Sequence, residues 1–375
     1  MFMIENKTRN YGMDLLRIVA MYFVVVLHIC NYGGVENTAS GIFQQGICCI
    51  YKTLTCTAVN VFALISGYVG YCSKKLKLSR FIELWMMVVF YSVIIAAIML
   101  FVGTEGVGYS ELLKACLPVT LNSYWYFSAY AGLFFLIPII NRVLDTLTRE
   151  YFVKTALVAV ALFSVYGLIS SYFNDPFGLK SGYSLLWLGV LYYLGAGLRR
   201  FDFGAKIKAQ KLAAAVGAVW AVSASLAITL AWIVSVVQME ILTTLADYVF
   251  FSYLSPIVVL LSVMMCMLFS KWSAKPRRKK LLTTCSASAF AVYIIHTNPL
   301  FWEHWFTDAF CFIATYTGFA MLVCIPVAAL AVFLVCLGID ILRAKLFVLL
   351  GIRALAQRAE ILFSNKFEKL VKVLH

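Results

Sequence analysis

The sequence predicts an all-α protein whose helices form a polytopic transmembrane bundle, and three observations support this prediction. First, the 375 residues are 63% hydrophobic and 13% charged, with a mean hydropathy of +0.91, whereas a soluble globular chain is about half apolar and a quarter charged. Second, apolar runs of about 20 residues, the length that crosses a hydrocarbon core, recur along the chain. Third, the basic residues between these runs favour one side of a membrane.

Polar residues, glycine and proline interrupt the apolar runs and so divide the chain into ten predicted spans. The first run follows Lys7 and Arg9 as a signal peptide does, but no small-residue cleavage site closes it, so we expect a retained first helix. The ten spans are expected at 13–30, 47–71, 81–102, 124–141, 153–172, 184–199, 212–236, 247–270, 286–302 and 312–338.

The distribution of charge tests this count. If the N-terminus lies in the cytoplasm, the outer side holds three basic residues (Lys52, Lys114 and Lys180) and the inner side holds the other 28 of the 31. A wrong number of spans would scramble this asymmetry beyond the error. We therefore predict ten spans in the plasma or inner membrane, with both termini cytoplasmic.

The last segment, 340–375, alternates apolar and basic residues. This pattern predicts an amphipathic helix lying on the cytoplasmic membrane surface. We accordingly expect two parts, a ten-span membrane domain at 1–339 and the tail at 340–375, with no separate soluble domain.

Several function classes are disfavoured by composition. The net charge of +14 suggests nucleic acid, but topology signals and contacts with anionic lipids explain most of the basic runs 74–80 and 275–280. Binding of a polyanionic cytosolic ligand is the alternative for these two runs. The eleven cysteines show no metal-binding spacing, and apolar filling of helices explains most of them; a pairing among Cys30, Cys48 and Cys49 is the alternative. The four histidines and the absence of a carboxylate pair within a span argue against a metal site or a di-acidic catalytic site.

The first span carries Arg17 and His28 in the stretch "DLLRIVAMYFVVVLHI". Eleven positions place both side chains on one helix face, about 16 Å apart along the axis. Ionisable residues inside a membrane are costly and usually face a cavity or a partner. The alternatives are a snorkelling arginine paired with Asp14 and a hydrogen-bonded packing histidine. The pair itself leaves open an enzyme or a transporter.

Further candidates lie on other spans. His296 follows Tyr293 by three positions at a depth similar to that of His28, so the two histidines could form a base and an orienting or oxyanion-stabilising group. Glu303 is a second-rank candidate to orient a base. The mid-membrane amide of Asn60 suits helix packing or a substrate tunnel. Aromatic residues that open the fourth span suit a membrane-interface belt or sugar stacking; they are Tyr124, Trp125 and Tyr126.

The first-span stretch resembles the signature of the membrane-bound acyltransferase-3 family, in which ten residues separate an arginine from a histidine. Three more segments resemble family motifs in the same order: "VNVFALISGYVG" (59–70), "SYWYFSAYAGLFFLIPIIN" (123–141) and "SASAFAVYIIHTNPL" (286–300). Together they span nearly the whole chain. One departure is the paired-arginine motif of the first cytoplasmic loop, where this chain has Lys77 and Arg80, so bidentate phosphate binding is weakened there.

The resemblance implies transfer of an acyl group, commonly acetyl, from cytosolic acyl-CoA to a hydroxyl of an extracytoplasmic acceptor such as a cell-surface glycan or its lipid-linked precursor. Acetyl-CoA would then be a donor substrate and no cofactor would be permanently bound. A basic inner mouth would hold the donor phosphates, formed by Arg17, Lys74, Lys75, Lys77 and Arg80.

In this scheme His28 acts as the general base or carries the acyl group itself, and His296 with Tyr293 orients the acceptor or stabilises the oxyanion. Candidate acceptor-binding residues are Asn60, Tyr124, Trp125, Tyr126 and Glu303. The competing hypothesis is a secondary transporter of an anionic or lipid-linked solute. Inverted repeats or helices broken by glycine or proline in matching halves would favour it, and we find neither in the sequence. The acceptor, the acyl length and the oligomeric state stay open.

Overall fold

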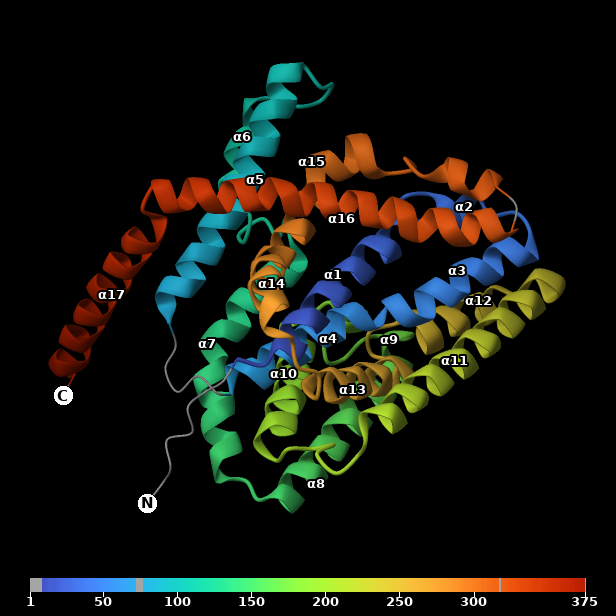
Figure 1. Ribbon diagram of the computed structural model, residues 1–375, viewed down its shortest axis with the longest axis horizontal. Helices are drawn as coiled ribbons and strands as arrows, with labels where there is room; N and C mark the ends of the chain where they lie inside the picture. Colours follow the sequence, from blue (N-terminus) through green and yellow to red (C-terminus); the bar gives the residue numbers. More distant parts are fainter. Residues whose placement is uncertain (1–8, 72–76, 317, 375) are drawn as a thin grey trace.

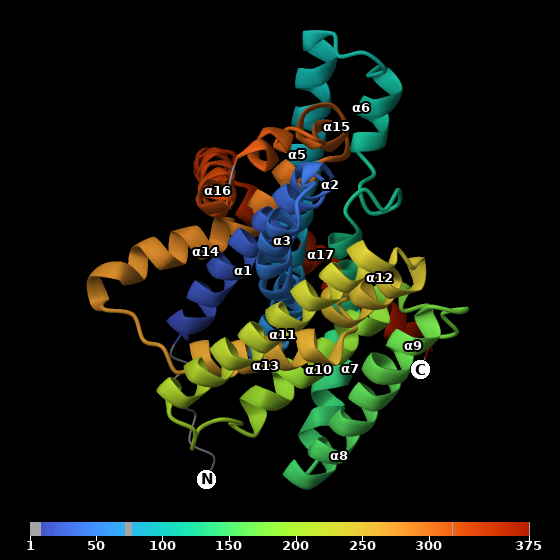
Figure 2. The ribbon, with the colours of Figure 1, turned by 90° about the vertical axis from the view of Figure 1, so that its right-hand side faces the viewer.

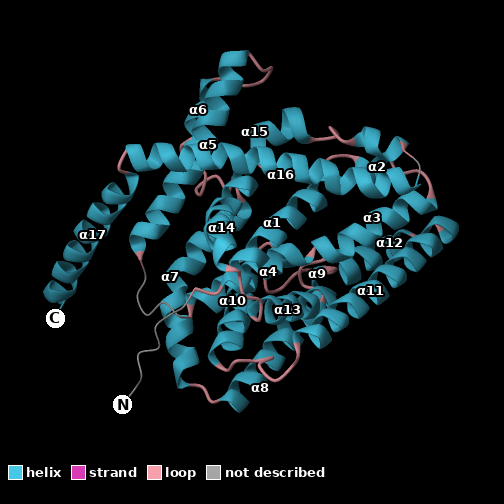
Figure 3. Ribbon diagram, in the orientation of Figure 1, coloured by secondary structure: helices cyan, strands magenta, loops and turns pink. Residues whose placement is uncertain are grey.

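The computed structural model describes residues 9–71, 77–316 and 318–374, and every regular element within these residues is helical. Figure 3 shows helices joined by short loops, with no strand in the described part. The all-α prediction is confirmed. Lys74 and Lys75 lie outside the described residues.

The bundle is built from long helices with short helices at their ends. The long helices are α1 (Tyr11–Cys30), α3 (Ile42–Thr55), α4 (Thr57–Gly70), α5 (Leu78–Val102), α7 (Trp125–Thr146), α8 (Arg149–Ala159), α10 (Leu185–Arg200), α11 (Ala209–Val237), α13 (Pro256–Ser270), α14 (Pro276–His296), α16 (Gly318–Leu349) and α17 (Ile352–Leu374). The short α-helices are α2 (Val35–Thr38), α6 (Tyr109–Ala115), α9 (Gly167–Ser171), α12 (Glu240–Ala246) and α15 (Pro299–Phe301). The π-helical turns are η1 (Val160–Tyr166), η3 (Asp247–Phe251) and η4 (Trp302–Phe306), and the 3₁₀ turns are η2 (Lys180–Gly182) and η5 (Cys311–Thr315).

Helices stand at all ten positions predicted to span the membrane, and among the described residues eight helical segments are long and apolar enough to cross it. The two that fall short are α10, which has 16 residues, and α14, whose first turns carry the basic run 275–280. The chain is therefore a multi-pass membrane protein. Ten crossings and the orientation of the termini stay predictions.

The central helix of the bundle is α1. Figures 1 and 2 show it between α14 and α3, and it also packs against α4, α13 and α16. Most of its length is buried: Leu16, Val25 and Ile29 are fully enclosed. The charged residues of this helix therefore face other helices rather than lipid, as a bilayer requires of ionisable side chains.

Helices α4 and α10 pack closely against each other. A Cβ atom added to Gly67 would lie 2.0 Å from the carbonyl oxygen of Tyr192, and one added to Gly195 would lie 2.1 Å from that of Leu64. The two glycines thus let the backbones approach each other closely, as small residues do in membrane interfaces. The face that Asn60 shares with Gly67 is accordingly a packing face rather than part of a tunnel.

The last predicted span continues further than expected. Helix α16 runs through Leu349 instead of ending near 338, and the chain then turns at Gly351, whose φ is +64°. Figure 1 shows α17 leaving α16 at a sharp angle beside α5. The Leu78 N–H at the start of α5 donates a hydrogen bond to Oε1 of Glu360 (2.8 Å), which ties α17 to the bundle.

Cys30, Cys48 and Cys49 are buried free thiols in this structure, as apolar filling predicts, and no disulfide joins them.

Candidate active site

Helices α1 and α14 lie side by side and run in the same direction. Near their N-terminal ends Arg17 contacts Ser286, and near their C-terminal ends His28 contacts His296. Both polar contacts lie along the interface between α1 and α14, which we call the seam, and apolar residues lie between them. Arg17 and His28 therefore face the same neighbouring helix, α14, as their predicted common face on α1 requires. Met21, Val24 and His28 line one cavity, and Arg17 does not.

The two histidines form a hydrogen-bonded pair. Nδ1 of His28 lies 2.9 Å from Nε2 of His296, and Nδ1 of His296 lies 2.5 Å from the carbonyl oxygen of Val292. A carbonyl oxygen can only accept, so Nδ1 of His296 carries a proton and, in the neutral ring, Nε2 is an acceptor. His28 then donates through Nδ1, which leaves its Nε2 unprotonated. A free imidazole nitrogen of this kind can accept a proton.

Arg17 is held in a polar cluster at the other end of the seam. Its Nη1 donates to Ser286 Oγ (2.8 Å) and lies 3.4 Å from Oδ1 of Asp14, and the Ser286 hydroxyl also donates to Asp14 (2.9 Å). Arg9 donates to both oxygens of the same carboxylate, through Nε (2.5 Å) and Nη2 (2.9 Å). The pairing of Arg17 with Asp14 is thus present. Because Nη1 makes these contacts and the side chain keeps 27% of its surface exposed, its remaining donors are available to a ligand.

A cavity of about 340 Å³ lies against His28; we call it the histidine cavity. Its wall is mainly aromatic and aliphatic, with a few hydroxyl and amide groups, which is typical of small-molecule sites. The lining residues are Met21, Val24, Leu27, His28, Tyr32, Val59, Phe62, Asn122, Ser123, Trp125, Tyr126, Tyr183, Tyr253, Phe290, Tyr293, Thr297, Pro299 and Trp302.

Some of the predicted site residues meet at this cavity. Tyr293, Trp125 and Tyr126 line it together with His28. His296 is fully buried behind His28 and is not among the lining residues. In this structure His296 therefore contacts His28 and does not reach the cavity.

Three predicted acceptor-binding residues lie elsewhere. The amide of Asn60 is fully buried, donates to the carbonyl oxygen of Tyr253 (2.8 Å) and accepts from Trp187 Nε1 (3.2 Å). The hydroxyl of Tyr124 is buried between Ser92 and Asn298. Glu303 is exposed on η4. Asn60 and Tyr124 thus use their polar atoms within the fold, and Glu303 points away because its neighbour Trp302 occupies the cavity wall.

Two further aromatic residues, Trp302 and Tyr32, line the cavity beside His28. The Trp302 ring stands edge-on to His28 at 4.9 Å, and the Tyr32 ring contacts both, at 6.1 Å from His28 and 4.8 Å from Trp302. Tyr32 lies four positions after His28, one helical turn on, which is the signal that could have found it. Trp302 follows a break at Pro299, and its approach depends on the chain reversing after α14.

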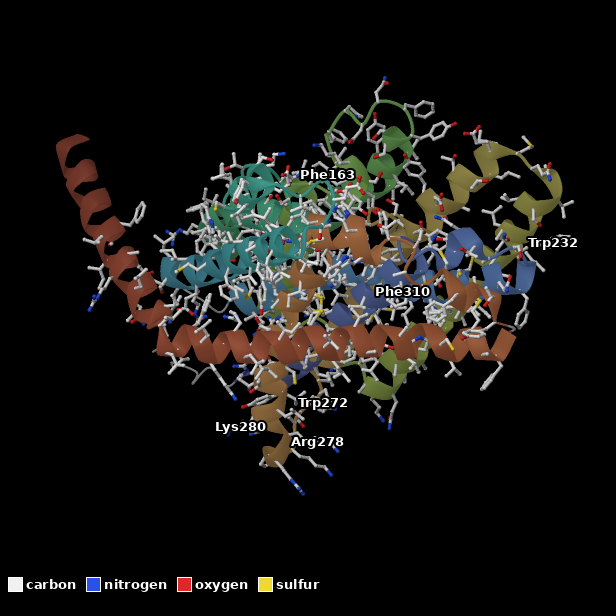
Figure 4. The ribbon with its side chains drawn as sticks, turned by 90° about the horizontal axis from the view of Figure 1, so that it is seen from above. Phe163, Trp232, Trp272, Arg278, Lys280 and Phe310 are labelled. Atoms are coloured by element: carbon white, nitrogen blue, oxygen red, sulfur yellow. The ribbon has the colours of Figure 1, made fainter. Side chains whose placement is uncertain are left out.

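The structure describes three of the five residues predicted to bind the donor phosphates, since Lys74 and Lys75 lie outside the described residues. Lys77 and Arg80 are exposed at the start of α5, and neither contacts Arg17 through a described interaction. A second basic run stands nearer to α1, because Lys279 Nζ lies 5.2 Å from the centre of the Tyr11 ring. Figure 4 shows Arg278 and Lys280 at the projecting start of α14. The end of the seam that carries Arg17 is therefore the more basic end.

The family comparison agrees with the motif resemblance. A family model described as an acyltransferase domain matches residues 10–340. Neither the comparison with curated proteins nor that with solved structures finds a match. The match covers most of the chain, including all four motifs and both histidines. The chain belongs to the acyltransferase-3 family of membrane acyltransferases and is an enzyme that transfers acyl groups other than aminoacyl groups.

Proposed function

We propose that this enzyme moves an acyl group, most simply acetyl, from acyl-CoA to a hydroxyl of a cell-surface glycan or its lipid-linked precursor. The observation that carries the proposal is the His28–His296 pair at the wall of the histidine cavity. Acyl transfer to a hydroxyl needs a base to take the hydroxyl proton, and the unprotonated Nε2 of His28 supplies one.

The proposed chemical step uses one proton and one electron pair at His28. Nε2 accepts the proton of the acceptor hydroxyl while the hydroxyl oxygen forms a bond to the thioester carbonyl carbon. The carbon–sulfur bond then breaks, and the proton returns from Nε2 to the departing CoA sulfur. His296 accepts the Nδ1–H of His28 throughout, so it holds the ring in the productive tautomer and stabilises the imidazolium.

An acyl-histidine intermediate would use the same nitrogen. It would form on Nε2 before the acceptor binds and would give ping-pong kinetics, whereas direct transfer gives sequential kinetics. We favour direct transfer, because the cavity holds hydroxyl and aromatic side chains beside His28 that suit a second substrate.

The donor is proposed to enter from the end of the seam that carries Arg17. Arg17 and the basic run at the start of α14 suit the phosphates of CoA. Between Arg17 and His28 the seam presents apolar residues, among them Met21, Val24 and Phe290, which suit a thin, largely uncharged arm ending in the thioester. By the positive-inside pattern this basic end is cytoplasmic, and the histidines lie toward the outer side.

The proposal is tested by label incorporation from radiolabelled acetyl-CoA into a cell-envelope extract, using sealed membranes that contain the wild type or His28→Ala at equal amounts. His304→Ala is the matched control, because His304 is exposed on η4 and does not line the cavity. We expect hydroxylamine-sensitive label with the wild type and the control but not with His28→Ala. Equal label from all three, or none from acetyl-CoA or succinyl-CoA, would refute the proposal.

A further inference from the structure

A second cavity, of about 410 Å³, adjoins the histidine cavity; we call it the polar cavity. The two share three wall residues, Leu27, Tyr183 and Tyr253. The rest of the polar cavity is lined by Asn31, Glu36, Lys52, Cys56, Ser181, Asp247, Tyr248, Phe251 and Ser252. None of these residues takes part in the chemistry described above.

The lysine of this cavity is already paired. Lys52 is 7% exposed, and its Nζ lies 2.6 and 2.8 Å from the two carboxylate oxygens of Glu36. The same ammonium group sits 4.3 Å above the centre of the Phe251 ring. A cation held in this way by a carboxylate and a ring face offers little attraction to an anionic ligand.

The groups that remain open in the polar cavity are acceptors. Oδ1 of Asn31 is buried and has no hydrogen-bond partner among the described residues. No described hydrogen bond or ion pair engages the Asp247 carboxylate, which faces the same cavity. With Lys52 and Glu36 compensating each other, Asp247 gives the lining a formal charge of −1. Such a site favours ligands that donate hydrogen bonds and disfavours carboxylates and phosphates.

We infer that the polar cavity holds the acyl acceptor, and that the acceptor unit bound there is a neutral, hydroxyl-rich sugar rather than an acidic or phosphorylated one. This inference rests on the proposed function and specifies its substrate class. Sugar hydroxyls would donate to Asp247 and to Asn31, two groups that otherwise lack partners.

The shared wall offers a route to the base. Tyr183 is the residue that follows η2, and Tyr253 lies in the turn before α13. Both shared tyrosines therefore lie on connecting segments and not within an α-helix. Their hydroxyls are 3.5 Å apart, and the Trp125 ring stacks on Tyr253 with centres 6.2 Å apart at 19°. These aromatic faces suit the C–H face of a sugar ring, so an acceptor in the polar cavity can extend one hydroxyl past the tyrosines toward His28.

The first test is Asp247→Asn, which keeps the side-chain shape and removes the charge. The acceptor is a cell-envelope extract titrated into membranes with labelled acetyl-CoA. Because hydrogen bonds to a charged acceptor are stronger than neutral ones, we expect the extract concentration for half-maximal rate to rise about fivefold to tenfold, with an unchanged maximal rate. Glu240→Gln, an exposed carboxylate in the same segment outside the cavity, is the control and should behave as wild type.

The second test uses the wild type alone. The labelled product is cut to single sugar units under conditions that keep the ester, and the units are separated by anion exchange. Label in the unretained, neutral fraction supports the inference, and label on an acidic or phosphorylated unit overturns it. An Asp247→Asn titration identical to that of Glu240→Gln also overturns it. Absence of any His28-dependent label would instead refute the proposed function, and this inference with it.

Discussion

The hydrogen bond between His28 and His296 predicts the effect of replacing His296 by methionine. His296 is fully buried and does not line the cavity, so the replacement removes the acceptor for the Nδ1–H of His28 without removing a group that touches substrate. Methionine fills similar space in a core without offering a strong acceptor. The carbonyl oxygen of Val292 keeps its helical partner.

The size of the effect follows from the tautomer of His28. Leaving a buried N–H without an acceptor costs about 1 to 3 kcal/mol. That penalty favours the other tautomer, in which Nε2 carries the proton and cannot act as the base. A shift of about 1 to 3 kcal/mol corresponds to a loss of roughly 5- to 150-fold in kcat. The acceptor KM should stay near the wild-type value, because His296 is separated from the cavity by His28.

The assay is the initial rate of label transfer in membranes at saturating donor, as a function of acceptor concentration. His296→Gln provides the conservative comparison, because the glutamine side chain can place an oxygen acceptor near the position of Nε2. We expect Gln to restore much of the rate that Met loses. A wild-type kcat for His296→Met, or equal losses for Met and Gln, would refute the positioning role.

Three further predictions concern the donor end and the helix packing. Arg17→Met should raise the KM for acetyl-CoA by roughly tenfold or more, since a charged hydrogen bond contributes about 1.5 to 3 kcal/mol; a KM unchanged in rate measurements would contradict donor binding by Arg17. Gly195→Ala should lower the thermal stability of the detergent-solubilised protein, because its Cβ would meet the Leu64 carbonyl oxygen at 2.1 Å, whereas Gly189→Ala on the same helix meets nothing within 4 Å and should be tolerated; equal melting temperatures would refute the packing argument. Asn60→Leu should cost about 1 to 3 kcal/mol for each of its two lost partners, Trp187 and Tyr253; a denaturation midpoint equal to that of the wild type would show that this amide is dispensable.

Much of the fold is readable from the sequence. Composition and apolar runs predict the all-α membrane bundle, and helices stand at each predicted position. The C-terminal end of the last span was less predictable. The residues that follow the apolar run alternate between apolar and basic and stay helical, so α16 continues until the turn at Gly351. A helical pattern carries little information about where a helix ends when both sides of the boundary favour helix.

The site was predictable where the spacing lies within one helix. Eleven positions place Arg17 and His28 on one face of α1. The spacing of three between Tyr293 and His296 places Tyr293 at the cavity wall and His296 against His28. The contact between the histidines, the approach of Trp302 and the polar cavity depend on how helices and loops distant in sequence pack together. Asn60 and Tyr124 illustrate the same limit, since their burial and their partners come from other helices.

The measurement that bears most directly on the account is the initial rate of acyl transfer by wild type, His28→Ala and His304→Ala, at matched amounts in the same membranes and with saturating donor. The account predicts that His28→Ala loses at least about a hundredfold in rate, as expected when a general base is removed, while His304→Ala keeps the wild-type rate. Transfer by His28→Ala at a rate close to that of the wild type would contradict the claim that His28 is the base.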